Sequence, residues 1–210
     1  MTSRGFTLIE TMFVTLLFPM LMLSVYAILD ISSTIFRTNG IYSELNEGSM
    51  QSLRYISREI GQTSPLANPS HLTIAAGAGG NNIVTFQIPV DWDNDGDAVT
   101  AALNPVVEWV AYDQIGQTQN GRLSGWIRYT VVNNQLVRQV LDAGLNPIAN
   151  LQQVVANNAQ TFTAALNQNQ KTLTMTLTLQ RADRVGQKGA QQRVLQSTFT
   201  SRTILRNAVS

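Results

Sequence analysis

The chain has 210 residues, a formal net charge of +1 and charged side chains at only 13% of positions. So small a net charge creates no strong overall field that would recruit nucleic acid. The absence of cysteine excludes disulfides and thiolate chemistry, and the single histidine, His71, excludes multi-histidine metal sites. A hydrophobic fraction of 44% excludes a disordered chain. The length fits one domain, or one domain with an appendage.

An uncharged apolar segment begins close to the N-terminus. Glu10 and Asp30 bracket residues 11–29, which carry no charge. As a helix these residues would span about 28 Å, close to the ~30 Å hydrocarbon core of a bilayer. A secretory signal peptide would have a small-residue cleavage site after its apolar run, and none is present here. The segment therefore predicts a membrane anchor that stays in the mature protein, and Pro19 inside it predicts a kink.

Helical periodicity continues beyond the apolar segment, with higher polarity. Apolar and small residues recur there at steps of three and four, namely Tyr42, Leu45, Ser49, Leu53, Ile56 and Ile60. This spacing predicts an amphipathic helix that lies against a globular head. We expect one helix from about Phe6 to Gln62, because Thr63-Ser64-Pro65 ends the pattern.

The rest of the chain alternates with period two and predicts antiparallel sheets. The expected strands are 83–88, 106–112, 126–132, 136–141, 162–166, 173–179 and 194–204. Asn133-Asn134 is expected to form a hairpin turn, and 194–204 is expected to pair with 173–179. We expect a single helical turn at 151–155 and a polar turn at 183–192. The predicted fold class is α+β, a long N-terminal helix packed on an antiparallel β-sheet head.

The sequence GFTLIE at residues 5–10, followed by the apolar run, resembles the processing site of type IV pilins and of type II secretion pseudopilins. The resemblance implies cleavage after Gly5 by a prepilin peptidase and N-methylation of Phe6. It also implies that Glu10 pairs with the N-terminal amine of a neighbouring subunit. A carboxylate inside a membrane helix costs ~2.5–3.5 kcal/mol unless it is paired or lies near the interface. The alternative is that Glu10 lies at the headgroup level.

The order of elements in the head is similar to that of the large minor pseudopilin J and the minor pilin W. The resemblance divides the chain into a leader (1–5), a transmembrane or fibre-core helix (6–30), an amphipathic continuation (31–62) and a β-rich head (63–210). It implies an inner-membrane protein with a periplasmic head that later enters a pilus or pseudopilus. The implied partners are other minor and major pilins or pseudopilins and the inner-membrane assembly platform.

An aspartate-rich segment leaves two interpretations open. Asp91, Asp93, Asp95 and Asp97 alternate with other residues, and a glycine precedes the last of them. This spacing matches the first half of a calcium loop, but Ala102 stands where an EF-hand has its glutamate. Either these carboxylates bind calcium together with a more distant carboxylate, or they form a solvated acidic turn. No other cofactor is expected.

The distribution of charge and the absence of known catalytic motifs limit the other functions that the chain could have. Residues 91–113 hold six acidic and no basic side chains, whereas residues 171–210 hold seven basic side chains and one acidic one, Asp183. These poles either steer neighbouring heads together or are two solvated faces. No G-x-S-x-G turn or phosphate-binding glycine loop is present, and His71 is expected in a surface loop.

These patterns predict a structural assembly subunit and no catalytic residue. The predicted function is that of a minor pilin or pseudopilin that helps to prime or cap a fibre. One alternative is a pilus-tip adhesin or DNA-uptake receptor, although the basic residues lack interleaved aromatics and nucleic acid is not the expected partner. A membrane-anchored enzyme is the third hypothesis, and a helix of this length argues against it.

Overall fold

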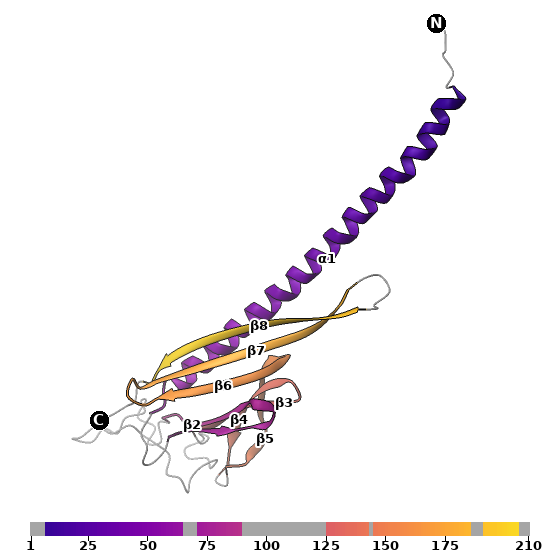
Figure 1. The fold of residues 1–210 in the computed structure, drawn as a ribbon. Helices are drawn as coiled ribbons and strands as arrows, with labels where there is room; N and C mark the ends of the chain where they lie inside the picture. Colours follow the sequence, from indigo (N-terminus) through magenta and orange to yellow (C-terminus); the bar gives the residue numbers. More distant parts are fainter. Residues whose placement is uncertain (1–6, 65–70, 90–124, 143–144, 186–190, 206–210) are drawn as a thin grey trace, which may run out of the picture.

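A computed structural model describes residues 7–64, 71–89, 125–142, 145–185 and 191–205 of the chain. These residues form one long helix and eight strands in two antiparallel sheets, which is the predicted α+β fold. Figure 1 shows that the sheets lie beside the second half of the helix, while the first half projects alone toward the N-terminus.

The helix α1 (Leu8–Ile60) is continuous over 53 residues. It begins two residues later than predicted because Thr7 is its N-cap, and it ends at Gly61, whose N–H donates to the carbonyl oxygen of Ser57 at 2.9 Å. The helix continues through Pro19 without a break and curves gently in Figure 1. The boundary at residues 30 and 31 therefore lies inside one helix.

The predicted apolar stripe is the face of α1 that packs on the head. The buried residues of α1 are Leu45, Ser49, Ser52, Leu53, Ile56 and Ile60. The two serines are buried without loss of hydrogen bonding, since Ser49 Oγ donates to the carbonyl of Leu45 at 2.8 Å and Ser52 Oγ lies 2.7 Å from the carbonyl of Gly48. Tyr42, at the start of the stripe, is only partly buried.

The larger sheet has five strands in the spatial order β1-β2-β3-β4-β5, and every pairing is antiparallel. Their bounds are β1 (Leu72–Ala76), β2 (Asn82–Gln87), β3 (Trp126–Val132), β4 (Gln135–Leu141) and β5 (Pro147–Asn157), with a short 3-10 helix η1 (Ala78–Gly80) between β1 and β2. The predicted turn joins β3 to β4, where Asn133 and Asn134 adopt φ values of 50° and 57°. Such a turn matches the twist of the flanking strands.

The helical turn predicted at 151–155 is wrong, because these residues belong to β5. Leu151 and Val155 are four residues apart, and both are partly buried. A spacing of four places two residues on one face of a strand as well as on one face of a helix. Pairing of β5 with β4 decides between the two conformations.

The smaller sheet has three antiparallel strands in the order β6-β7-β8. They are β6 (Ala159–Asn167), β7 (Thr172–Val185) and β8 (Gln191–Ile204). The predicted pairing of β7 with β8 is confirmed, with Leu177 opposite Phe199. Both strands extend further than predicted, so Asp183 lies in β7 and not in a polar turn.

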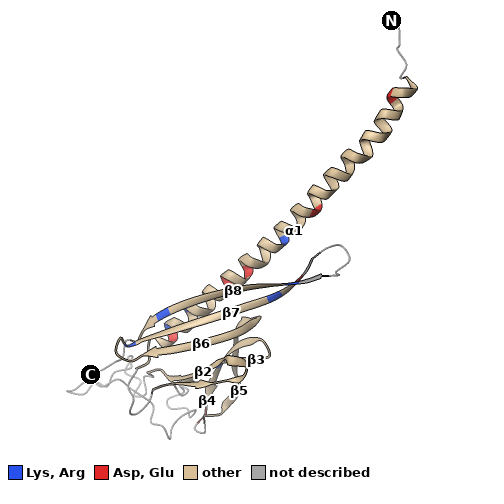
Figure 2. Cartoon of the chain, in the orientation of Figure 1, with Lys and Arg blue, Asp and Glu red and all other residues tan. Residues whose placement is uncertain are grey.

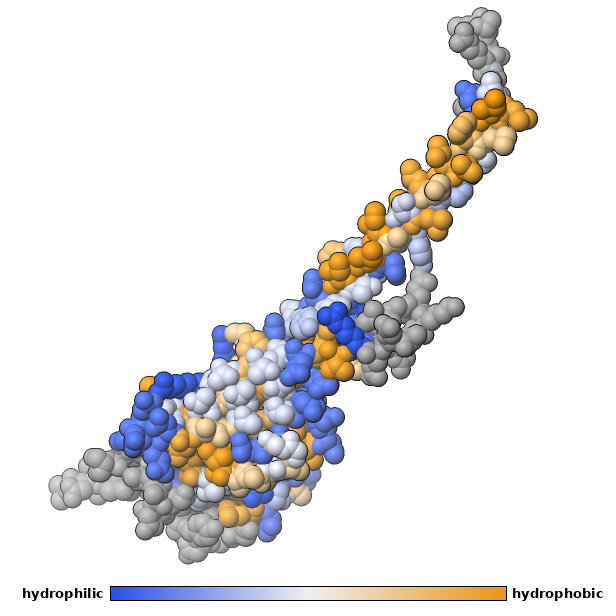
Figure 3. Space-filling view, in the orientation of Figure 1, coloured by the Kyte–Doolittle hydropathy of each residue, from blue (hydrophilic) through white to orange (hydrophobic). Residues whose placement is uncertain are grey.

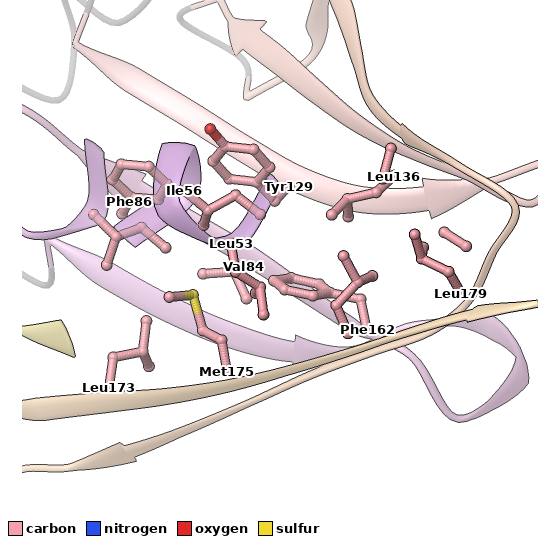
Figure 4. Close-up of a cluster of buried hydrophobic side chains, with 14 of the residues drawn as sticks. Leu53, Ile56, Val84, Phe86, Tyr129, Leu136, Phe162, Leu173, Met175 and Leu179 are labelled. Atoms are coloured by element: carbon pink, nitrogen blue, oxygen red, sulfur yellow. The ribbon is translucent and has the colours of Figure 1, made fainter. Parts of the chain in front are cut away.

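The hydrophobic core lies between α1 and the inner faces of both sheets. Figure 4 shows Leu53 and Ile56 of the helix beside Val84 and Tyr129 of the larger sheet and Met175 of the smaller one. The rings of Phe86 and Tyr129 stack within this core, with centroids 5.9 Å apart. Burial of these side chains is the main force that holds the helix to the head.

Two asparagines join the sheets at the outer edge of β6. Asn81 Oδ1 accepts a hydrogen bond from the backbone N–H of Phe162 at 2.7 Å, and Asn82 Oδ1 accepts one from Ala164 at 2.8 Å. Their side chains therefore take the place that a neighbouring strand would have. These bonds satisfy two N–H groups at the edge of β6 and connect the start of β2 to that edge.

Candidate functional site on the projecting helix

The first half of α1 exposes an apolar surface along its whole length. Residues 7–31 are all exposed, and Figure 3 shows hydrophobic side chains along the projecting helix. Figure 2 shows no charged residue on α1 between Glu10 and the next acidic position, Asp30. These two charges are 20 residues apart, which is about 30 Å along a helix. By length and composition α1 is able to cross a membrane.

Three hydroxyl groups of this segment are bonded to their own helix. Thr15 Oγ1 lies 3.0 Å from the carbonyl oxygens of Thr11 and Met12, and Ser24 Oγ donates to the carbonyl of Met20 at 2.8 Å. Thr11 Oγ1 likewise lies 2.9 Å from the carbonyl of Leu8. Hydroxyls bonded in this way can face an apolar environment at little cost.

Glu10 lies in the first turn of α1 and closes a capping box with Thr7. Its Oε2 accepts hydrogen bonds from the backbone N–H of Thr7 at 2.8 Å and from the Thr7 hydroxyl at 3.0 Å. The Thr7 hydroxyl accepts in turn from the backbone N–H of Glu10 at 3.4 Å. The spacing Thr-x-x-Glu is the sequence signature of this motif, and it explains why the helix begins at Leu8. The sequence analysis did not predict this capping role of Glu10.

A second apolar patch lies between Asp30 and the head. Ile31, Ile35 and Phe36 are 60%, 53% and 74% exposed. Ile31 and Ile35 are four residues apart and share one face of α1, and Phe36 lies about 100° further round the helix. We refer to these three residues as the junction patch.

Polar side chains occupy the face of α1 opposite Ile31 and Ile35, and one of them contacts the head. Asp30, Ser33 and Arg37 recur at steps of three and four, on the side away from Ile31 and Ile35. Arg37 Nε lies 3.2 Å from Oδ1 of Asp183 in β7, whose side chain is only 6% exposed. The β7–β8 hairpin therefore reaches back along α1 as far as Arg37 and leaves the junction patch uncovered.

A partly buried ion pair connects the last turn of α1 to the larger sheet. Arg138 Nη2 donates to Glu59 Oε1 at 2.6 Å, and Arg138 Nε lies within 3.1 Å of both carboxylate oxygens. The hydroxyl of Tyr129 donates to Glu59 Oε2 at 2.5 Å. Burial and the charge of Glu59 raise the pKa of Tyr129, so this hydroxyl remains a donor. Glu59 does not belong to the stripe that periodicity predicts, and the sequence analysis did not predict this cluster.

His71 is buried and does not lie in a surface loop as predicted. It is 4% exposed, and its Nδ1 lies 2.9 Å from Oε1 of Gln87. Its backbone carbonyl accepts from the hydroxyl of Thr63 at 3.1 Å, so it packs under the end of α1. The polar residues around His71 in the sequence indicated a loop, but they did not show that α1 and β2 cover it.

One arginine of the basic C-terminal segment is paired with α1. Arg181 Nη1 lies 2.5 Å from Oε2 of Glu44. Figure 2 shows that basic residues remain at the end of the β7–β8 hairpin that lies far from the N-terminus. The acidic pole at 91–113 lies outside the described residues, as does the strand predicted at 106–112.

Several predicted site residues also lie outside the part of the chain that the structure describes. They are the processing residues Gly5 and Phe6 and the four aspartates of the calcium prediction, Asp91, Asp93, Asp95 and Asp97. The calcium, cleavage and methylation hypotheses therefore stay predictions. Comparison of the chain with protein-family models, curated proteins and solved structures finds no match.

Proposed function

We propose that this chain is a minor pilin or pseudopilin, a structural subunit that helps to prime or cap a type IV pilus or a type II secretion pseudopilus. The apolar half of α1 is its membrane anchor before assembly and its contact with other subunits afterwards. The GFTLIE sequence supports the proposal at the level of processing. The observation that carries it is the extent of exposed apolar surface on α1.

The exposed apolar surface is longer than a membrane anchor requires. From Leu8 to Phe36 the helix has 29 residues and a length of about 43 Å. A hydrocarbon core of ~30 Å would cover all of it only at a tilt of about 46°, beyond the 0–40° range of membrane helices. That tilt would also draw Asp30 into the apolar core. A lipid anchor alone accounts for residues 11–29 and leaves the junction patch outside the hydrocarbon core.

A neighbouring apolar helix accounts for the whole surface. Exposed contiguous apolar surface of this kind marks contact with protein or membrane. In a fibre, the helices of adjacent subunits would cover both the membrane-length segment and the junction patch. Arg37 would keep its contact with Asp183 of the subunit's own head. This division favours a subunit of an assembly over a membrane-anchored enzyme, which needs no apolar surface beyond the bilayer.

The hydrogen bonds of Glu10 leave room for the N-terminal amine of a neighbouring subunit. Both bonds from Thr7 end on Oε2 of the carboxylate. A carboxylate has about four acceptor sites, so the capping box leaves capacity for an amine of a neighbouring subunit. A charge-assisted hydrogen bond to that amine would be stronger than the neutral bonds of the cap.

Processing is tested by mass spectrometry of the N-terminal peptide from membranes and from sheared surface fibres. We expect a peptide that begins at methylated Phe6. Its presence in sheared fibres identifies a pilus, and its restriction to membranes indicates a short pseudopilus. A chain that still begins at Met1 or Thr2 in both fractions, in cells that contain the peptidase, contradicts the proposal.

The junction patch is tested by site-specific cross-linking, because a chain without cysteine lets a single introduced thiol carry the probe. Ile35→Cys is labelled with a maleimide photo-cross-linker, and Ser33→Cys, two residues away on the polar face, is the matched control. We expect Ile35→Cys to form adducts with other pilin-like subunits and Ser33→Cys to form few. Adducts with lipid alone at both positions would support a simple anchor.

A further inference from the structure

A cavity lies where the end of α1 meets the end of β8, at the part of the head farthest from the membrane-length segment. Its volume is about 580 Å³. It is lined by Ser57, Arg58, Gly61 and Gln62 of the helix end and by Arg202, Thr203 and Ile204 of the strand end. No residue of the projecting helix surface takes part in it, so it is separate from the site described above.

Two guanidinium groups lie at this cavity without a carboxylate. Arg58 forms no ion pair with any described residue. Arg202 Nη2 donates to the side-chain oxygen of Gln170, which is neutral. By contrast, Arg37, Arg138 and Arg181 each have a carboxylate partner. Among the described residues, the two guanidinium groups at the cavity therefore have no carboxylate partner.

A buried hydroxyl in the wall of the cavity also lacks a partner. Thr203 is 9% exposed, and its Oγ1 has no hydrogen-bond partner among the described residues. Buried hydroxyls are normally bonded, because an unpaired one loses its bonds to water. The methyl group of Thr203 faces Gly61, another wall residue. A rotation of about 120° about χ1 would place the hydroxyl where the methyl group now lies, beside Gly61.

We propose that this cavity binds a carboxylate from an acidic peptide segment of a neighbouring subunit. Guanidinium groups bind planar carboxylates through paired N–H···O bonds, and the Thr203 hydroxyl supplies a further donor. Charge complementarity supports an acidic peptide as the occupant. The segment 91–113 of this same chain shows the chemistry required, with six acidic residues and no basic one.

That the acidic segment belongs to a neighbouring subunit rests on the proposed function, but carboxylate recognition by the cavity does not. Binding is measured with purified full-length protein in detergent micelles, away from any fibre. The probe is a fluorescent peptide with the sequence of residues 91–97, and the same peptide with asparagine in place of every aspartate is the ligand control. A failure here leaves the processing and cross-linking experiments unaffected.

Three variants and one matched control test the site. We expect Arg58→Gln and Arg202→Gln each to weaken binding of the acidic peptide by about tenfold, since each removes a charged hydrogen-bond donor. Thr203→Val should weaken binding several-fold while the thermal unfolding midpoint stays equal or rises, because the variant removes an unpaired hydroxyl. Arg54→Gln, one turn earlier on α1 and outside the cavity, should change binding less than twofold.

Four outcomes would overturn the proposal. One is equal binding of the asparagine peptide, and another is an equal loss of affinity in Arg54→Gln, which would indicate a diffuse basic surface. The third is tighter binding of inorganic phosphate than of the peptide, which would indicate a small-anion site. The fourth is binding that appears only when the chain's own Asp91, Asp93, Asp95 and Asp97 are changed to asparagine, which would assign the cavity to the chain's own segment.

Discussion

At the residue scale, the polar side chains inside the head are informative because each needs a partner. Glu59 on α1 is satisfied by Arg138 and by Tyr129, which come from two different strands. The side chains of Glu59 and Arg138 retain 14% and 18% of their exposure, so solvent screens the pair only slightly. The cluster therefore fixes the position of the last helical turn on the larger sheet.

We expect Arg138→Ala to lower the free energy of unfolding by about 3 kcal/mol, because it leaves the Glu59 carboxylate buried without its ion-pair partner. Chemical denaturation of the full chain in detergent micelles, followed by near-ultraviolet circular dichroism, measures the change. The control is Arg181→Ala, which breaks an exposed pair with Glu44 and should cost less than about 1 kcal/mol. Equal losses in the two variants would contradict a buried role for Arg138.

His71 is expected to make stability depend on pH. Burial lowers its pKa, and the hydrogen bond with Gln87 opposes the shift in part. The folded protein therefore binds a proton less readily than the unfolded chain, whose histidine has a pKa of about 6.5. The stabilisation is complete above that pH and is lost as the pH falls through the range below it.

The measurement compares the free energy of unfolding at about pH 7.5 and about pH 5.5 for the native chain and for His71→Asn. The native chain should lose more stability between these two conditions, because only it has a histidine to protonate. The variant keeps an amide near the position of Nδ1, and every other titrating group is common to both proteins. Identical pH profiles would contradict the prediction.

At the scale of single elements, α1 joins two environments through one continuous backbone. Its first half has apolar residues on all faces, whereas its second half has a stripe with Leu45, Leu53 and Ile56 that the head covers. The helix is thus suited to an apolar surrounding at one end and to a sheet surface at the other. The change occurs near Arg37, where the β7–β8 hairpin begins to cover the helix.

The β3–β4 hairpin depends on two left-handed residues. Asn133 and Asn134 both have positive φ, a conformation that costs most side chains about 1–2 kcal/mol. We expect Asn133→Ala to destabilise the head by about 1 kcal/mol and Asn134→Gly to be neutral or slightly stabilising. Thermal unfolding of the two variants beside the native chain measures the difference. A loss of the same size with glycine would show that the asparagine side chains, and not the backbone conformation, stabilise the turn.

At the scale of the whole molecule, a five-stranded sheet and a three-stranded sheet pack together against one face of α1. The smaller sheet lies along α1 through β7 and β8, and the larger sheet is held at the helix end by Glu59 and Arg138. The sheets meet where Asn81 and Asn82 close the edge of β6. This arrangement places the membrane-length helix and the arginine-lined cavity at opposite ends of the protein.

We expect Asn82→Ala to cost about 1–3 kcal/mol of stability, because the N–H of Ala164 loses its acceptor inside the junction of the sheets. Asn157→Ala is the control, since Asn157 accepts an exposed bond from Gln135 and should matter by less than about 0.5 kcal/mol. Hydrogen exchange at Ala164 should become faster in Asn82→Ala alone. An unchanged exchange rate would show that Asn82 does not protect this edge.

Much of the fold follows from local patterns in the chain. Steps of three and four identified the buried face of α1 through Leu45, Leu53 and Ile56, and Asn133-Asn134 located the β3–β4 hairpin. The charges of Glu10 and Asp30 mark the limits of the membrane-length segment in the sequence. Sequence patterns predict these features because each depends on residues that are close together in the chain. The roles of Gly5, Phe6 and Glu10 and the calcium hypothesis stay predictions.

The features that sequence patterns missed all depend on long-range partners. Glu59 and Arg138 are 79 residues apart in the chain, and Asp183 meets Arg37 only because the hairpin runs back along the helix. His71 is buried and is bonded to Thr63, just beyond the end of α1, and to Gln87 of β2. Periodicity reports how one segment divides apolar from polar faces, and it carries no information on which distant segment lies against that face. Burial and pairing of charges are properties of the packed elements, so they emerge only when the helix and both sheets have come together.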